Sequence, residues 1–256
     1  MEVHAHTHPE HSGPRKKWTH YFWEFLMLFL AITLGFLVEN QREHYVEHNR
    51  AKDYAKSLIE DLSEDTTEML DVIKEDGILL ICFDSITTTI QKGINKTVPG
   101  SFYYFCTIGV FAPRVVWYNA TLTQITQSGN MRYFRNNQLV KKLSNYYSNQ
   151  HFISGLNDWD SRYRDESIKL RNRILSNRFY SQYSGFTIAR WMQIPGSLKN
   201  NKLPLQSSET EILNEFANSF ETRRRILNLL MTRDYPNALA SARKLIEMLK
   251  KEYHLR

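Results

Sequence analysis

The most apolar stretch of the chain covers residues 18–38, WTHYFWEFLMLFLAITLGFLV. It contains no Lys, Arg or Asp and a single acidic residue, Glu24. About 20 helical residues at a rise of about 1.5 Å each cover the roughly 30 Å hydrocarbon core of a bilayer. Trp18, Tyr21 and Trp23 would lie at headgroup depth, where aromatic rings are enriched. The pattern therefore predicts one transmembrane helix over residues 18–38, and no other apolar run is long enough to be a second.

After residue 38 the pattern becomes that of a long charged helix that continues to about Gln91. Its predicted apolar stripe consists of Tyr54, Leu58, Leu62, Met69, Ile73, Leu80 and Phe83. Its predicted exposed side carries eight acids, namely Glu60, Asp61, Glu64, Asp65, Glu68, Asp71, Glu75 and Asp76. The spacing of an EF-hand is absent, so we interpret these acids as a face for solvent or for a basic partner.

The remainder of the chain predicts further helices separated by two irregular segments. Glycine and proline in residues 92–113 indicate a loop or short hairpin, and residues 179–205 are also irregular. Between them we expect a helix over residues 117–127, stopped by Ser128-Gly129-Asn130, and a long helix over residues 138–176. Two more helices are expected after Ser207 and after Tyr235. The predicted fold class is all-α, with one transmembrane helix that continues into an antiparallel helical bundle.

Charge offers a reason for the antiparallel arrangement. The later half of the helix over residues 138–176 and its end are basic, with Arg162, Arg164, Lys169, Arg171, Arg173 and Arg178. Packing it antiparallel to the acidic helix would bring opposite charges together, although exposed pairs contribute only ~0.2–1 kcal/mol each. An acidic external partner for the basic face is the alternative.

Charge on either side of the apolar run predicts the topology. Arg15, Lys16 and Lys17 precede it, whereas Glu39 and other acids follow. The positive-inside rule then places the N-terminus in the cytoplasm and the large domain outside. A cleavable signal peptide is disfavoured because no small-residue cleavage site follows the apolar run. We expect a cytoplasmic tail at residues 1–17, the span at residues 18–38, and a periplasmic domain at residues 39–256.

The composition argues against several functions. The 256 residues carry a net charge of +6, with 33 basic and 27 acidic side chains and no basic run longer than three. This mild excess gives no support to nucleic-acid binding. No P-loop, dinucleotide fingerprint, nucleophile elbow or HExxH motif occurs. We therefore expect no enzyme activity and no cofactor.

Three groups of residues are candidate sites. Glu24, Ala31 and Gly35 can share one face of the span, where a small-xxx-small pair lets another helix approach and a polar group seeks a partner. The alternative for Glu24 is that it reaches back to the nearby interface. This face is the predicted contact with copies of the chain or with other membrane proteins.

The second group is the only cysteine pair, Cys82 and Cys106. A disulfide is permitted outside the cytoplasm and would close a loop of about 25 residues, worth roughly 3 kcal/mol. Two buried thiols are the alternative.

The third group is His4, His6 and His8, whose alternation can chelate a divalent metal. The alternative is a solvated tail without a metal, as termini are commonly poorly ordered.

Several of these features together resemble a known group of proteins. They are the span with Glu24, the Tyr54, Leu58 and Leu62 spacing with its acids, the segment SGNMRYFRNNQLVKKLSNYY, and a helical end with Leu245-Ile246. The chain resembles an uncharacterised family of single-span membrane proteins common in the Bacteroidota. The resemblance implies an inner-membrane location with a periplasmic domain, and it carries no known activity.

The function expected from these patterns is that of a membrane-anchored scaffold or interaction module in a membrane protein assembly. The alternative is a periplasmic sensor domain that binds a ligand. A cytoplasmic tail of about 17 residues would be too short for an output domain, so a sensor would have to signal through a partner protein.

Overall fold

The computed structural model describes residues 18–183, 185–188 and 196–255. Its first helix, α1, runs from Trp18 to Gln91 without a break at Gly77. The prediction that the apolar run and the charged stretch form one long helix is therefore confirmed. The chain divides into two parts at Ala51, within this helix, and residues 1–51 and 52–256 are described separately below.

In the first part, α1 provides the one described helix that is long and apolar enough to cross a membrane. Its most apolar 18-residue window has a mean hydropathy of 2.0, and none of that window is buried against protein. Large apolar side chains exposed in this way need a covering of lipid or of another helix. Length and composition are the two properties that identify this candidate span, and an N-terminal signal sequence shares both.

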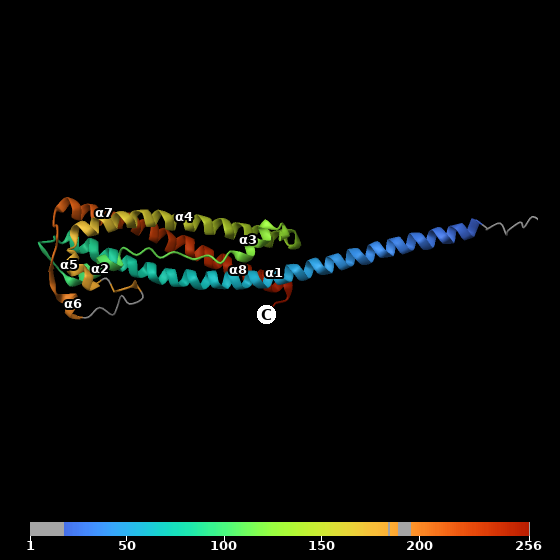
Figure 1. Ribbon diagram of the computed structural model, residues 1–256, viewed down its shortest axis with the longest axis horizontal. Helices are drawn as coiled ribbons and strands as arrows, with labels where there is room; N and C mark the ends of the chain where they lie inside the picture. The colour runs from blue at the N-terminus through green and yellow to red at the C-terminus, as the bar shows by residue number, and fades with distance from the viewer. Residues whose placement is uncertain (1–17, 184, 189–195, 256) are drawn as a thin grey trace, which may run out of the picture. The chain divides into compact units, whose positions relative to one another are not determined.

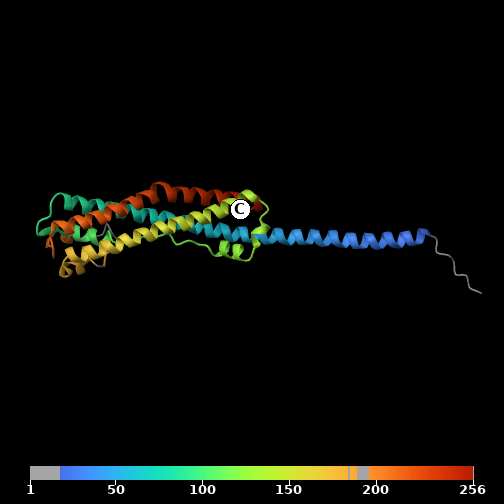
Figure 2. The same cartoon turned by 90° about the horizontal axis from the view of Figure 1, so that it is seen from above.

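The second part is built from three long helical rods (Figures 1 and 2). The first is α1 from residue 52 onward, and the second is α4, Asn137–Ile174. The third rod joins α7, Thr210–Leu229, through the π-helical turn η4, Leu230–Asp234, to α8, Tyr235–Tyr253. The predicted all-α class is confirmed.

Contacts between side chains show that α1 and α4 run in the same direction. The Tyr146 hydroxyl on α4 lies 2.9 Å from the Asp65 carboxylate on α1. Further along both helices, Asp160 of α4 is near enough to Asp76 of α1 for their charges to interact. The expected antiparallel packing of these two helices is therefore wrong. Exposed ion pairs are too weak to decide whether two helices pack parallel or antiparallel when the connection between them is long enough for both arrangements.

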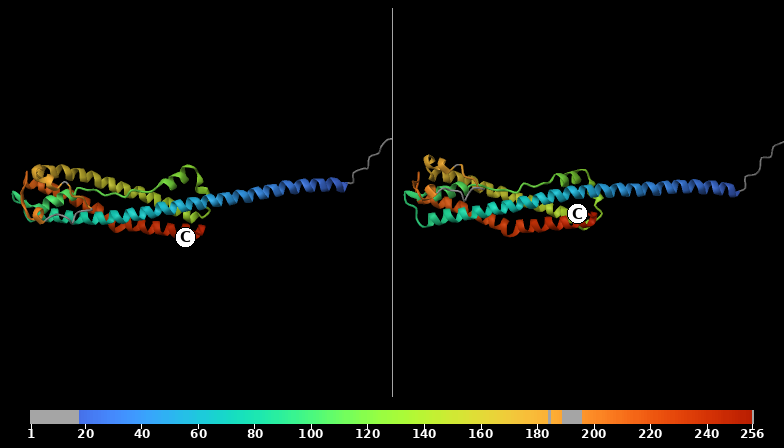
Figure 3. Two further views of the ribbon diagram at one scale, coloured as in Figure 1. Left: turned by 60° about the horizontal axis from the view of Figure 1, so that its bottom comes forward. Right: turned by 90° about the horizontal axis from the view of Figure 1, so that it is seen from below.

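The third rod is antiparallel to α4, as three pairs show in order. Ser167 meets Ser219 at 2.9 Å, Asn157 meets Tyr235 at 3.3 Å, and Asn136 meets Glu252 at 3.0 Å. Further views of the ribbon show the same arrangement (Figure 3). The bundle is thus antiparallel only in part.

A long connection joins the two parallel helices. It contains the strand β1, Thr97–Pro99, the helices α2, Gly100–Ile108, and α3, Ala120–Gln127, and the turn η1, Asn130–Tyr133. Gly129 stops α3 with a positive φ of 69°. Asn136 caps α4 by accepting hydrogen bonds from the backbone amides of Gln138 and Leu139. The predicted stop of α3 and the predicted start of α4 are confirmed, whereas α3 begins at Ala120, three residues later than expected.

The end of the bundle where α1 finishes differs from the prediction. Residues 92–113 are not a loop or hairpin, because they form α2 and the strand β1. That strand pairs antiparallel with the distant β2, Lys202–Pro204. The short elements α5, Asn177–Tyr180, η2, Ser181–Tyr183, and α6, Gly196–Asn200, lie before β2. A Cβ atom at Gly100 would collide with the Leu198 carbonyl oxygen, so glycine permits this close approach of backbones.

The buried positions of α1 in the bundle follow a strict alternation of three and four residues. They are Ala55, Leu58, Leu62, Asp65, Met69, Val72, Asp76, Leu79, Phe83, Ile86 and Ile90, and two further buried residues, Cys82 and Thr87, lie beside this line. This is the heptad seam of coiled-coil packing. Tyr54, Ile73 and Leu80 of the predicted stripe flank the seam and are half-buried. Two seam positions hold acids, Asp65 and Asp76, which were predicted to be exposed. That prediction is wrong for both.

Candidate functional site

The first buried acid, Asp65, ties three segments of the bundle together. Its carboxylate accepts hydrogen bonds from the Tyr146 hydroxyl at 2.9 Å and the Gln150 amide at 2.8 Å, both on α4. It also accepts one from the backbone N–H of Tyr118, in the connection, at 2.8 Å. One turn earlier, Asp61 accepts the backbone N–H of Thr121 at 3.0 Å. These two acids therefore hold the connection against α1.

Burial raises the pKa of the Asp65 carboxyl to about 6, even though its three donors favour the ionised form. The pKa of its partner Tyr146 is raised by burial and by the neighbouring carboxylate. The hydroxyl therefore stays a donor, and the contact between α1 and α4 persists over the neutral range of pH.

The second buried acid, Asp76, belongs to a cluster at the centre of the bundle. Arg223 of α7 is fully buried and makes a forked ion pair with Asp160 of α4, at 2.9 and 3.0 Å. The same guanidinium donates to the carbonyl oxygens of Gly109 and Phe111, each at 2.6 Å. It therefore binds α4 and the connection to α7 at once.

This cluster contains one more acid than it has bases. Both carboxylate oxygens of Asp160 accept hydrogen bonds from Arg223. Asp76 is 2% exposed and makes no hydrogen bond or ion pair with the part of the chain that is described. Burial, followed by the charge of Asp160, raises the pKa of Asp76 to about 8, and the charge of Arg223 opposes this. With Asp76 protonated the cluster is electrically neutral, and this is the form that the buried position favours.

A change of helical register lies beside the cluster. The buried positions Ile212, Phe216, Ser219, Arg223, Ile226 and Leu230 keep the alternation of three and four residues. Asp234 and Tyr235 are both buried after them, and the line of buried apolar side chains resumes at Tyr235, five residues after Leu230. The π-helical turn η4 absorbs the extra residue. Tyr235 then follows it and donates from its hydroxyl to Asn157 at 3.3 Å. The insertion thus lets both halves of the third rod face α4.

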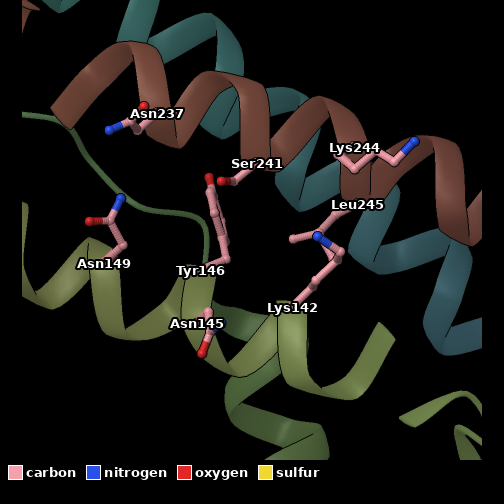
Figure 4. A pocket seen from close by; sticks show the side chains of 8 residues that line it. All are labelled: Lys142, Asn145, Tyr146, Asn149, Asn237, Ser241, Lys244 and Leu245. Atoms are coloured by element: carbon pink, nitrogen blue, oxygen red, sulfur yellow. The ribbon is translucent and has the colours of Figure 1, made fainter. Parts of the chain in front are cut away.

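A polar groove on the surface is the third feature. It lies between α4 and α8, has a volume of about 240 Å³, and is lined by eight side chains (Figure 4). Tyr146, which binds Asp65, is one of them. The groove therefore adjoins the contact between α4 and α1.

The residues predicted as a membrane contact are all exposed in the first part of the chain. A Cβ atom at Gly35 would meet nothing within 4 Å, so the face is open. Glu24 has a neighbour within its own helix, because His20 lies 3.7 Å from its carboxylate. The sequence reasoning overlooked this i,i+4 pair, which gives Glu24 a polar contact when the imidazole is protonated.

Cys82 and Cys106 lie in one apolar core but are free thiols in this structure. Burial raises the pKa of Cys82 to about 12 and that of Cys106 well above its usual value. The two cysteines share one core, as a disulfide would require, but the structure has them as two buried thiols, which was the alternative expectation.

The candidate metal ligands His4, His6 and His8 lie outside the described residues. Within the described ranges, no three His, Cys, Asp or Glu side chains are grouped closely enough to hold a metal ion.

The residues that sequence reasoning missed are Asp65, Asp76, Asp160 and Arg223. The signal for the first two was present, because both fall in phase with Leu58, Leu62 and Met69 in the alternation of three and four residues. Arg223 stands in a run of three arginines whose side chains point in different directions. The sequence does not tell which one is buried.

Comparisons with models of protein families, with curated proteins and with solved structures found no match to this chain.

Proposed function

We propose that this chain is a single-pass protein of a bacterial inner membrane that serves as a scaffold or interaction module in a membrane protein assembly. Residues 18–38 would be the span, the N-terminus would be cytoplasmic, and residues 39–256 would form the periplasmic domain. The proposal includes no catalysis, no cofactor and no nucleic acid.

One observation carries the proposal. The exposed apolar segment and the heptad seam of the bundle belong to a single helix, α1. A helix that carries both features is suited to anchoring a folded domain at a bilayer. The basic residues Arg15, Lys16 and Lys17 before the segment support the orientation, by the positive-inside rule.

The partner surface in the membrane would be the face with Glu24, Ala31 and Gly35. Gly35 has open space where a side chain would be, which suits close approach by a helix of another membrane protein or of a second copy. The pair formed by His20 and Glu24 would add a polar contact at one end of this face.

Extraction in a mild detergent, followed by mass spectrometry of the intact particle, tests the proposal. We expect a particle of fixed stoichiometry that contains the chain with other membrane proteins or with further copies of itself. Gly35→Leu should reduce the association, and Thr33→Leu, which adds bulk to the opposite face, is the matched control. A monomer of this chain alone, under conditions that preserve known complexes of the same membrane, would contradict the proposal.

A second candidate function is that of a sensor domain that signals through a partner. The observation in its favour is the polar groove between α4 and α8, which adjoins the Tyr146 contact with α1.

A further inference from the structure

The polar groove has an unusual balance of chemical groups for a surface cleft between two helices. Its walls come from α4 and α8, and Figure 4 shows side chains of both helices facing the space between them. Two of the eight lining residues are lysines, and none is acidic. The polar lining residues are Lys142, Asn145, Asn149, Asn237, Ser241 and Lys244. The floor is formed by the buried residues Tyr146 and Leu245.

The two ammonium groups differ in their surroundings. Lys244 lies 3.2 Å from the carboxylate of Glu247, in an exposed pair one turn further along α8. Lys142 makes no ion pair with any residue in the described ranges, and it is exposed. Exposed pairs such as Lys244 and Glu247 contribute little and exchange readily. Both lysines can therefore turn to an anion placed between the helices.

The absence of acids is local to this part of the cleft. Beyond Lys142 and Lys244 the groove widens toward the start of α4 and the end of α8, where Glu247 and Glu252 join the lining. The narrower stretch of the groove therefore has positive charge without a carboxylate, and its amide and hydroxyl groups are concentrated there.

We propose that this groove binds a small organic anion, a phosphate or carboxylate compound that also carries hydroxyl groups. Lys142 and Lys244 would hold the anionic group, and Asn149, Asn237 and Ser241 would hydrogen-bond the hydroxyls. The volume of about 240 Å³ lies just below the roughly 300–1,000 Å³ typical of drug-sized ligands, so the ligand is a small metabolite. This inference deepens the sensor candidate and rests on it, and it is independent of the scaffold proposal.

Binding in the groove has a route to α1. A ligand against Tyr146 contacts the ring whose hydroxyl donates to Asp65. Fixing this ring would strengthen the contact between α4 and α1, the helix that also carries the apolar segment. A soluble anion could in this way act on the membrane-anchored helix without a large rearrangement.

The test uses the full chain in phosphatidylcholine nanodiscs, titrated calorimetrically with glucose 6-phosphate, glucuronate and glucose. We expect both anionic probes to bind and glucose not to bind. Lys142→Ala and Lys244→Ala should each weaken binding about fivefold to tenfold. Lys141→Ala is the matched control, because Lys141 is exposed and does not line the groove. It should leave the affinity unchanged.

Two results would overturn the inference. One is the absence of binding by both anionic probes at millimolar concentration. The other is equal weakening by Lys141→Ala and Lys142→Ala, which would indicate diffuse attraction to a basic surface. Neither result would bear on the particle mass that tests the scaffold proposal.

A further arm identifies the source of the anion. Adding phosphatidylglycerol to the nanodiscs should leave the affinity for glucose 6-phosphate unchanged if the natural ligand is soluble. If phosphatidylglycerol instead weakens the binding of glucose 6-phosphate to the wild type but not to Lys142→Ala, the groove binds an anionic lipid headgroup.

Discussion

Replacing Asp76 by asparagine should stabilise the protein at neutral pH. Asparagine has nearly the same shape as aspartate and needs no proton to be neutral. The pKa of Asp76 is about 8 in the folded chain, against 3.8 for an ordinary aspartate. Folding at pH 7 therefore requires this carboxyl to take up a proton that it does not hold when unfolded.

The sign and size of the effect follow from the two pKa values. Below about pH 4 the carboxyl is protonated in both states and costs nothing. Between about pH 4 and 8 only the folded state is protonated, so the free energy of unfolding falls as pH rises, by about 1.4 kcal/mol per pH unit. At pH 7 the accumulated loss is up to about 4 kcal/mol, which Asp76→Asn should recover.

Unfolding of the full chain in detergent, followed by circular dichroism from pH 4 to pH 9, measures this. A domain of about 200 residues gains roughly 2–4 °C in Tm per kcal/mol. The Tm of Asp76→Asn should therefore be up to about 8–16 °C above that of the wild type at pH 7. At pH 4 the two proteins should have the same Tm. Asp71→Asn, at an exposed acid of the same helix, is the control and should change little. Asp65 and Glu75 also have raised pKa values, but both proteins contain them, so only Asp76 can make the two curves of Tm against pH differ in slope. Parallel curves for Asp76→Asn and the wild type would therefore refute the reasoning.

Three further predictions concern other parts of the chain. Arg223→Met should destabilise the bundle by about 3–5 kcal/mol, because it leaves the Asp160 carboxylate buried without a partner. Arg225→Met, at an exposed position of the same helix, should change the urea midpoint little, and equal effects would contradict the buried ion pair. Cys82 and Cys106 should resist alkylation until the protein is unfolded, whereas a linked peptide in a non-reducing digest would restore the disulfide prediction. Glu24→Ala should shift the protein toward smaller species in membrane crosslinking, and an unchanged size distribution would mean that residues 18–38 only anchor the chain.

The long helix and its apolar segment could be predicted because their signals are local. Apolar residues in a run, or at helical spacing, indicate a helix whatever the rest of the chain does. The cap at Asn136 and the stop at Gly129 are local in the same way, since each acts on backbone groups within one turn.

The relative direction of α1 and α4 could not be predicted from their charges. Direction follows from the path of the residues between them, and the pairing of β1 with β2 joins segments about 100 positions apart. The exposed charges that suggested antiparallel packing are weak and are satisfied within single helices, as in the pair of Asp71 and Lys74.

The buried acids mark the limit of reading helix faces by residue type. Asp65 and Asp76 are in phase with the apolar seam, but a carboxylate is normally assigned to the exposed side. The structure surrounds Asp65 with three hydrogen-bond donors, which makes its burial tolerable. For Asp76, burial raises the pKa to about 8, which favours the neutral form at pH 7. In this helix, the position of a residue in the alternation of three and four residues indicates burial better than its residue type does.

The measurement that tests the central claim most directly is protease digestion of intact spheroplasts that contain the full chain, tagged at each end. If residues 18–38 cross the inner membrane with the bundle outside, protease should remove the C-terminal tag and the bundle. A membrane-bound fragment with the N-terminal tag should survive. Loss of the N-terminal tag with protection of the bundle would reverse the orientation. Release of the intact chain from the membrane by alkaline washing would contradict the anchor itself.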